Sequence, residues 1–480
     1  MSGNIQQQFD DVVSEKLQDE QLQNNLLSVM GTLKCNRKKL ITSRFLDWED
    51  LRDRGYQIKQ NSLSQLDVLL ERFETNAVKN GFKVHWANDS EEANEIVLNL
   101  MLNNNITKIL KGKSMVSEET HLNSFLKKKG LNPIETDLGE IIIQLIDEPP
   151  VHIVVPAIHK NRYQIGEIFM NKLGMPLESD PEKLNGMARK YLRKEFKEFK
   201  MGLSGVNFAI ANEGAIWLLE NEGNGRMSTT ACDIHVAFCG IEKVIESFED
   251  AATLNALLIP SATGAPVTCY NNIISSPRRN DELDGPREVH IILLNNNRTN
   301  ILKDPHYYHS LSCIRCGTCL NHCPVYDKIG GHAYLSTYPG PIGEVISPQI
   351  FGLDKFSPML DLCSLCGRCS EVCPVKIPLV NLIRDLRSER VGQGRKNVMG
   401  SDKVTKNCRE SFVISNFTNA ATNPIKWRFA LKMIGVFSVF GKFLAPFIPG
   451  LKQWLLYRDF PNINSNMHKK ISNMRGVIYE

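Results

Sequence analysis

The chain has 480 residues, of which 42% are hydrophobic and 23% are charged, an ordinary composition for a globular protein of two or three domains. Residues 1–21 are polar and contain no apolar secretory segment, so we expect a reducing cytoplasm and no disulfide framework. The net charge of +4 is uneven, because residues 395–480 contain 14 Lys or Arg and 4 Asp or Glu, which leaves the first 394 residues near −6.

Residues 1–75 are expected to form a charged helical arm. Leu63, Leu66, Leu69 and Leu70 recur at helical spacing, which places them on one face of a helix. An arm of this kind serves as an intramolecular packing element or as a dimer contact, and we interpret it in that way rather than as a site.

Residues 76–298 alternate short apolar runs with polar helical stretches, which is typical of an α/β domain with a largely parallel sheet. Helices are expected at 89–104 and 117–130. Strands are expected at 106–110, 141–145, 152–156, 206–210, 216–219 and 290–294.

Four loops of this domain have a composition suited to ligand binding. Lys111–Ser114 follows a strand directly and favours a phosphate or carboxylate cradle, although it lacks the spacing of a P-loop. Asn212–Gly214 and Asn221–Arg226 flank one strand, and Ser261–Gly264 is rich in small residues. Glycine loops at strand ends bind ligands in many α/β sheets, and they also simply turn the chain, so both interpretations stay open.

Most histidines and five of the thirteen cysteines are isolated in the sequence. No histidine pair has the His-x-x-x-His spacing of a helical metal site, so we interpret them as packing or surface residues. The isolated cysteines are expected to be plain thiols. The histidines of the α/β region are His85, His121, His152, His159, His235 and His290, and the isolated cysteines are Cys35, Cys232, Cys239, Cys269 and Cys408.

Residues 299–394 contain two copies of one cysteine pattern. The first reads Cys313-x-x-Cys316-x-x-Cys319-x-x-x-Cys323-Pro324, and the second reads Cys363-x-x-Cys366-x-x-Cys369-x-x-x-Cys373-Pro374. This is the run by which bacterial ferredoxins ligate [4Fe-4S] clusters. A zinc site would use paired Cys-x-x-Cys knuckles and would leave two cysteines of each run in unexplained register.

In two-cluster ferredoxins the fourth cysteine of a run ligates the other cluster. The spacing therefore predicts two [4Fe-4S] clusters. Cluster 1 is expected on Cys313, Cys316, Cys319 and Cys373, and cluster 2 on Cys323, Cys363, Cys366 and Cys369. Gly317 and Gly367 stand at the same place in each run and leave room for a cluster. Residues 330–343 are too rich in Gly and Pro for one long helix and are expected to cover the clusters, whereas 377–387 should be helical.

Residues 395–480 form a basic tail with an apolar stretch at Met433–Phe440. That stretch is too short to span a bilayer, which needs about 20 residues. Its basic and aromatic residues suit either peripheral contact with the inner face of a membrane or docking on an acidic partner protein. The aromatic residues are Trp427, Phe429, Phe437 and Trp454.

Five segments distributed over the chain are Lys113–Glu119, Pro156–His159, Asn221–Arg226, Ser312–Gly317 and Gly330–Tyr334. Together they closely resemble the LutB/YkgF family of lactate-utilisation iron–sulfur proteins, from about residue 40 to the tail. The resemblance implies a LUD-type domain, similar to the sheets of sugar-phosphate isomerases and CoA-transferases, followed by an α-helical ferredoxin-like domain with two [4Fe-4S] clusters. In the family the position of Cys363 is often a small residue, so the resemblance supports the other seven cysteines and spacing alone supports Cys363.

The resemblance also implies a part in oxidising L-lactate to pyruvate, together with a cysteine-rich iron–sulfur protein and a smaller LUD-domain protein. Our first hypothesis is therefore an electron-transfer subunit with an unidentified acceptor, since no Gly-x-Gly-x-x-Gly follows a strand. The second is a catalytic subunit that binds the hydroxyacid near Glu213, Glu222 and Arg226. The third is an iron–sulfur redox sensor, which the chain supports least because it has no nucleic-acid-reading element.

Overall fold

The structure is a computed structural model that describes residues 2–392, 394, 397–404 and 408–430. The chain forms two compact units, residues 1–404 and residues 405–480. In the described part of the second unit, α20 spans Cys408–Ala421. The apolar stretch Met433–Phe440, together with Phe437 and Trp454, lies outside the described residues. Among the helices that are described, none combines the length and apolar character that crossing a membrane requires.

A six-stranded, all-parallel sheet forms the centre of the first unit, as the alternation of strands and helices predicts. Alternate side chains of β7 enter two different hydrophobic clusters, with Ala237 and Cys239 in one and Val236 and Phe238 in the other. Both faces are therefore buried, which explains the continuous apolar strands. In spatial order the strands are β1 (Lys83–Ala87), β10 (Glu288–Leu294), β7 (Ile234–Gly240), β4 (Met201–Gly205), β2 (Lys108–Lys111) and β3 (Asn132–Glu135).

A smaller four-stranded sheet and eight helices complete the α/β part. The sheet has the order β8 (Val244–Ile245), β5 (Phe208–Ile210), β6 (Ala215–Glu220) and β9 (Tyr270–Ile274). The helices are α5 (Ser90–Asn103), α6 (Met115–Glu119), α7 (Leu122–Lys128), α8 (Leu138–Leu145), α9 (Arg162–Leu173), α10 (Pro181–Glu198), α11 (Asn224–Thr230) and α12 (Phe248–Thr263).

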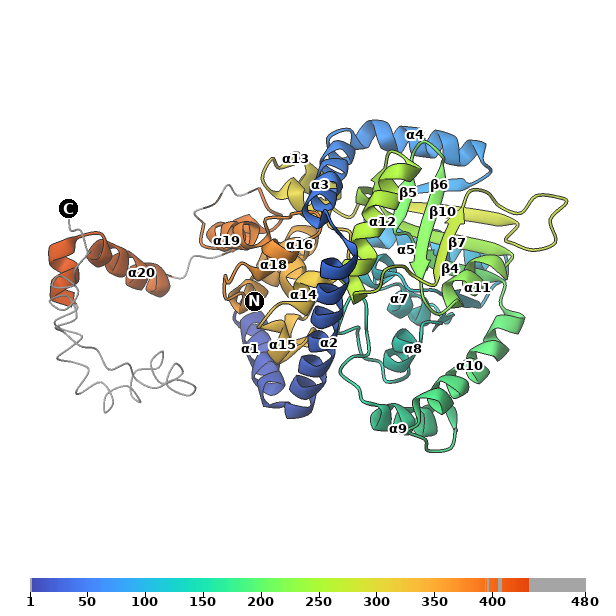
Figure 1. The fold of residues 1–480 in the computed structure, drawn as a ribbon, viewed down its shortest axis with the longest axis horizontal. Helices are drawn as coiled ribbons and strands as arrows, with labels where there is room; N and C mark the ends of the chain where they lie inside the picture. The colour runs from blue at the N-terminus through green and yellow to red at the C-terminus, as the bar shows by residue number, and fades with distance from the viewer. Residues whose placement is uncertain (1, 393, 395–396, 405–407, 431–480) are drawn as a thin grey trace. The chain divides into compact units, whose positions relative to one another are not determined.

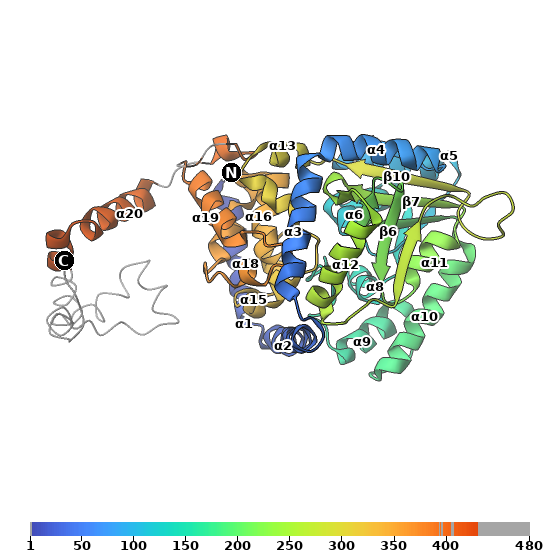
Figure 2. The ribbon, with the colours of Figure 1, turned by 45° about the horizontal axis from the view of Figure 1, so that its top comes forward.

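The N-terminal helices join the α/β part to the cysteine-bearing part. Figures 1 and 2 show α2 and α3 running between the cysteine-bearing helices and the sheets. The buried Arg52 donates to the carbonyl of Cys373, and Lys59 donates to the carbonyl of Glu242 over 2.7 Å. The arm is thus an intramolecular packing element. Its helices are α1 (Ser2–Gln18), α2 (Glu20–Arg44), α3 (Trp48–Ser64) and α4 (Leu66–Lys79).

The cysteine-bearing part consists of short helices and two 12-residue helices, α16 and α19. Helix α16 is almost entirely buried and begins at Gly340, inside the segment expected to be irregular. The expected helix near 377–387 is present as α19. The α-helices are α13 (Arg298–Lys303), α14 (Thr318–Asn321), α15 (Tyr326–Ile329), α16 (Gly340–Phe351), α17 (Leu353–Phe356), α18 (Arg368–Val372) and α19 (Leu379–Arg390). The 3-10 helices of the unit are η1 (Ile241–Lys243), η2 (Tyr307–Ser312), η3 (His332–Tyr334), η4 (Ser357–Leu362) and η5 (Ser401–Lys403).

Two predicted strands are wrong. Residues 141–145 belong to α8, because the side chain of Asp137 accepts the free N–H groups of Gly139 and Glu140 and starts a helix. Residues 152–156 form a turn, because the ring of His152 accepts the N–H groups of Val154 and Val155 and leaves them unavailable to a neighbouring strand.

The remaining expectations differ from the structure in smaller ways. The helix expected at 117–130 is split into α6 and α7 by His121, which adopts a left-handed backbone with φ of 52°. The expected strands near 106–110, 206–210, 216–219 and 290–294 are present as β2, β5, β6 and β10. Strands β1, β3, β4, β7, β8 and β9 were not predicted.

Candidate iron–sulfur centres

Four cysteines from two distant segments line one pocket, called the first centre here. Cys313, Cys316 and Cys319 follow one another through a tight loop into α14, and Cys373 stands at the end of α18. Apolar side chains from α16 and the chain after Cys373 close the pocket. The lining is Cys313, Ile314, Arg315, Cys316, Gly317, Thr318, Cys319, Ile342, Cys373, Pro374, Val375, Ile377 and Leu379.

The other four cysteines line a second pocket, the second centre. Cys363, Cys366 and Cys369 come from the second run, and Cys323 comes from the first. Each pocket therefore takes its fourth cysteine from the other run, so the structure brings together the two sets of cysteines that the spacing selects. The lining is Cys323, Pro341, Glu344, Cys363, Ser364, Cys366, Gly367, Cys369 and Val380.

The two loops repeat the same backbone conformation. Arg315 and Leu365 stand at matched positions with φ of 61° and 56°, and Gly317 and Gly367 have φ of 73° and 83°. The N–H groups of Arg315 and Leu365 each point at the preceding cysteine sulfur over 3.4 Å. A short loop with two left-handed residues curls the chain around its sulfurs, and N–H groups aimed at sulfur are a means by which proteins set cluster potentials.

The donor set fits an iron–sulfur cluster. Burial raises the pKa of Cys323 and Cys369 to about 12 and that of Cys363 and Cys373 to about 11. Burial also raises the pKa of Cys319 well above its ordinary value. Thiols held in this way do not ionise by themselves at neutral pH, so a bound cation has to stabilise the thiolates, as iron does.

A buried guanidinium faces the first centre. Arg315 is only 8% exposed, forms an ion pair with Glu242 at 3.3 Å and stacks on Tyr338 with 4.8 Å to the ring centroid. Burial alone would raise the pKa of Glu242, but Arg298 and Arg315 outweigh burial and lower it to about 2. Arg315 therefore stands as a positive charge between the cysteine pocket and a permanently ionised carboxylate.

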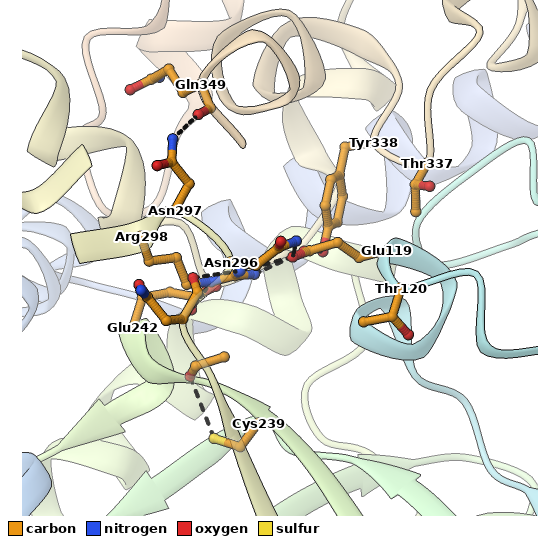
Figure 3. A network of polar contacts seen from close by, with 12 residues as sticks. Glu119, Thr120, Cys239, Glu242, Asn296, Asn297, Arg298, Thr337, Tyr338 and Gln349 are labelled. Carbon is orange, nitrogen blue, oxygen red and sulfur yellow. Dashed lines mark hydrogen bonds and ion pairs between the residues drawn. The ribbon is translucent and has the colours of Figure 1, made fainter. Parts of the chain in front are cut away.

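This ion pair continues into a buried network at the carboxyl ends of β7 and β10 (Figure 3). Arg298 donates to both oxygens of Glu119 over 2.8 Å and to Glu242 over 2.5 Å, and the hydroxyl of Tyr338 donates to Glu119 over 2.6 Å. Gly240 leaves room for this carboxylate, because a Cβ at that position would lie 2.2 Å from Glu242 Oε2 and would force the ion pair to shift. The end of the sheet where α/β proteins usually bind ligands thus abuts the first centre.

The second centre has different surroundings. Glu344 of α16 lines the pocket while 1% exposed, and burial raises its pKa well above its ordinary value. Arg387 donates to the carbonyls of Leu360 and Cys363, which fixes the start of the loop. Cys366 is exposed and Leu365 is 41% exposed. The second centre therefore lies at the surface of the first unit.

Comparisons with known proteins agree with this division. Residues 70–294 match the LUD domain family, residues 309–377 match the 4Fe-4S dicluster domain family, and residues 385–477 match the family of the C-terminal part of lactate utilisation protein B. A relative called lactate utilization protein B from Bacillus licheniformis is 38% identical over 467 residues, which cover 96% of this chain and 95% of that protein. The chain belongs to the lactate utilization protein B family.

Other members of the family match over almost the whole chain. The uncharacterized electron transport protein YkgF of Escherichia coli K12 is 37% identical over 454 residues, 94% of this chain and 93% of that protein. The lactate utilization protein B of an Exiguobacterium species is 36% identical over 482 residues, 99% of both chains. A LUD domain with a parallel sheet followed by a 4Fe-4S dicluster domain is thus the architecture of this family member.

In this family member the expected cradle at Lys111–Ser114 is occupied by the chain's own groups. The Nζ of the buried Lys111 binds Glu135 at 2.5 Å and Glu118 at 3.2 Å, which outweigh burial and raise the pKa of Lys111. Lys113 donates to the carbonyl of Val154, and Ser114 caps α6. Side chains that are already paired in this way have little capacity for a phosphate.

The structure separates the three residues of the hydroxyacid hypothesis. Glu213 lies in the turn before β6, whereas Glu222 and Arg226 follow it, so a strand of on the order of 20 Å stands between them. The N-terminus of α11 is filled by Glu220, which accepts the N–H groups of Gly225 and Arg226. Glu213 is therefore not part of a site with the other two.

Glu222 nevertheless joins a set of carboxyls at the carboxyl ends of β2 and β3. Burial, with a smaller effect from Asp137, raises the pKa of Glu222 to about 7. Burial and Glu135 raise the pKa of Glu140 well above its ordinary value, and one of its oxygens is buried without a hydrogen-bond partner among the described residues. Perturbed carboxyls at this end of a sheet are typical of a ligand site.

The isolated residues are mostly structural. His85 stacks on His290, with 2.9 Å between Nε2 and Nδ1, and His235 bonds Ser204 in the core. Cys232 and Cys239 are buried, and Cys35 and Cys269 are exposed, in agreement with plain thiols. The side chain of Cys408 is outside the described residues.

The sequence did not predict five residues around the two centres, because no local motif marks them. They are Glu119, Glu242, Arg298, Arg315 and Glu344.

Proposed function

We propose that this protein carries electrons released when L-lactate is oxidised to pyruvate, as an electron-transfer subunit rather than as an enzyme on its own. The observation that supports this proposal best is the pair of four-cysteine pockets, both contacted by α16. The names of its relatives, lactate utilization protein B and an electron transport protein, support a part in lactate utilisation and in electron transfer. The partners would be a cysteine-rich iron–sulfur protein and a smaller LUD-domain protein, with an acceptor still to be identified.

Two [4Fe-4S] clusters would supply one-electron transfer when bound. Cluster 1 would be held by Cys313, Cys316, Cys319 and Cys373, and cluster 2 by Cys323, Cys363, Cys366 and Cys369. The chain would contribute mostly buried sulfurs, N–H groups aimed at them and an apolar lining, and these features would set the potentials. We further propose that the parallel sheet is related to those of sugar-phosphate isomerases and CoA-transferases.

Anaerobic reconstitution with counting of iron and sulfide, followed by EPR, tests the two-cluster proposal. Two [4Fe-4S] clusters require about eight irons per chain. Cys363→Ser should alter the spectrum of one cluster and leave the other unchanged, whereas Cys269→Ser, at an exposed cysteine outside both pockets, should change neither. About four irons in the wild type, or an unchanged spectrum in Cys363→Ser, would contradict the ligand assignment.

A second candidate function is binding of the hydroxyacid by the LUD domain, next to Glu140 and Glu222. The unpartnered oxygen of Glu140 and the raised pKa of Glu222 favour it, because a protonated carboxyl donates hydrogen bonds to an anion. Calorimetric titration of the reconstituted protein with L-lactate and with pyruvate tests it. A heat of binding that disappears in Glu222→Gln but persists in Glu213→Gln would support this site. The absence of any heat of binding with both ligands would contradict it.

A further inference from the structure

Three side chains that have no part in either cysteine pocket converge at the junction of the LUD and dicluster parts. Glu148 and His159 lie in the loop between α8 and α9, and His332 lies in η3. One donor atom from each lies within 4.8 Å of the other two. The two imidazole rings are 5.0 Å apart and nearly perpendicular. Two imidazoles and one carboxylate are the donor set of many zinc and other divalent transition-metal sites.

The hydrogen bonds determine which ring nitrogens carry protons. His332 Nε2 lies 2.8 Å from the carbonyl oxygen of Pro149, which only accepts, so Nε2 carries the proton and Nδ1 has the lone pair. A backbone carbonyl on the far nitrogen is the usual partner that orients a metal-bound histidine. His159 Nε2 lies 2.6 Å from Glu148, and its Nδ1 is buried with no hydrogen-bond partner among the described residues.

The three groups have the charges that a metal site requires, and the proton that His159 Nε2 donates to Glu148 moves to the unpartnered Nδ1 when Nε2 binds a metal. Burial lowers the pKa of His159 to about 4 and lowers that of His332, so both imidazoles are neutral at pH 7. Burial raises the pKa of Glu148, but hydrogen bonds from Lys160 and His159 outweigh it, so the carboxylate is ionised. Lys160 donates a hydrogen bond to one oxygen of Glu148 over 2.8 Å, which leaves the other oxygen, the one facing His159, as the metal ligand.

We propose that Glu148, His159 and His332 bind one divalent transition-metal ion of the zinc class, with water completing the coordination, and that this ion ties the 148–159 loop to the turn after α15. The ion replaces the hydrogen bond between His159 and Glu148. Lys160 and Lys16 add positive charge nearby, which weakens the binding of a cation relative to a closed structural zinc site.

A second hydrogen-bonded group of two histidines and one glutamate provides the matched control. His85 Nε2 bonds His290 Nδ1 at 2.9 Å, and His290 Nε2 bonds Glu288 at 3.1 Å. His290 uses both ring nitrogens within this group, and the three residues do not gather their donors around one point as Glu148, His159 and His332 do. His85→Gln therefore removes a partly buried imidazole without touching the proposed site.

Equilibrium dialysis of the reconstituted protein, with its clusters intact, against micromolar Zn²⁺ tests the proposal. We expect about one zinc per chain besides the cluster iron, by the three-ligand logic of such sites. The bound zinc should be lost in His159→Gln and in His332→Gln and kept in His85→Gln. No zinc in the wild type, or equal zinc in all four proteins, would overturn the proposal.

X-ray absorption on the zinc-loaded wild type gives a reading that does not depend on the folding of any variant. Nitrogen and oxygen ligands at about 2.0–2.1 Å support the site, whereas a sulfur shell at about 2.3 Å would overturn it by placing the zinc on cysteines. Iron counted on the same sample separates the two cases further, because zinc on the cluster cysteines displaces iron and zinc on Glu148, His159 and His332 does not.

Discussion

The two cysteine loops have matched backbones and very different surroundings. In the first loop, Arg315 is buried against Glu242 and Tyr338. At the matched position of the second loop, Leu365 is 41% exposed. A Cβ on Gly317 would lie 3.0 Å from His152, whereas a Cβ on Gly367 would meet no atom of the described residues within 4 Å.

This difference separates what the local sequence determines from what the fold determines. The cysteine spacing and two left-handed residues shape each loop by themselves. The 152–156 turn and the Arg298 network then cover the first loop, whereas the second loop lies at the surface of the described residues. Within the described residues of the first unit, the first centre therefore lies against the sheet edge and the second lies at the surface. Four changes test this comparison.

The largest expected effect comes from Arg298→Met, which leaves Glu119 and Glu242 buried without their main cation. Breaking a buried ion pair costs about 3–5 kcal/mol, so the midpoint of urea unfolding should fall markedly. Because the network reaches the first loop through the ion pair between Glu242 and Arg315, the EPR signal of the first centre should disappear at lower urea than that of the second. Arg287→Met, at a 72% exposed side chain, should change stability by no more than about 0.5 kcal/mol. Loss of both EPR signals at the same urea concentration would contradict a specific role of the Arg298 network in stabilising the first loop.

Arg315→Gln removes a positive charge next to the first centre. With an effective dielectric constant of about 20, a charge in the lining of the pocket is worth on the order of 2 kcal/mol, or ~100 mV for one electron. The potential of the first centre should fall by that order, because reduction adds negative charge that Arg315 stabilises. Anaerobic redox titration followed by EPR measures the shift. Arg315→Lys should restore most of it, and an unshifted potential would show that Glu242 already cancels the charge.

The fold could be predicted from the sequence only where periodicity and length agree. The parallel sheet follows from alternating strands and helices, but a five-residue apolar run such as 141–145 suits a buried helix equally well. The signal that decides it is local and was available, since Asp137 and Glu140 have the Asp-x-x-Glu pattern of a helix start. The turn at 152–156 had no such signal, because it depends on the ring of one histidine.

The cysteine sets could be proposed from the sequence because ligand spacing is a local property of the chain. Their surroundings could not. Glu119 and Arg298 are 179 residues apart and meet only because β10 and α6 end at the same edge of the sheet. Buried ion pairs of this kind leave no periodic pattern, and a single Arg or Glu in a sequence is far more often exposed.

The pH dependence of the first loop should follow His152, which lies against Gly317. Burial lowers the pKa of His152 to about 3, whereas the unfolded chain titrates near 6.5. The unfolded state therefore binds a proton first as pH falls, and about 2 kcal/mol of stability should be lost between pH 6.5 and pH 5. His152→Asn retains an acceptor for the N–H groups of Val154 and Val155 but does not titrate. Urea midpoints at pH 7 and pH 5 should differ less in this variant, and an equal difference would assign the acid sensitivity elsewhere.

The smallest expected effect comes from placing the same charge in the second loop. Leu365→Arg puts a guanidinium at the matched position, but the exposed position leaves it in water, where the charge is worth on the order of 0.6 kcal/mol, or ~25 mV. The potential of the second centre should rise by that amount and less in high salt, since salt screens exposed charges. A shift as large as that of Arg315→Gln would mean that residue 365 is shielded from water in the full-length protein. The ratio of the two shifts therefore measures how differently the fold surrounds two loops of the same conformation.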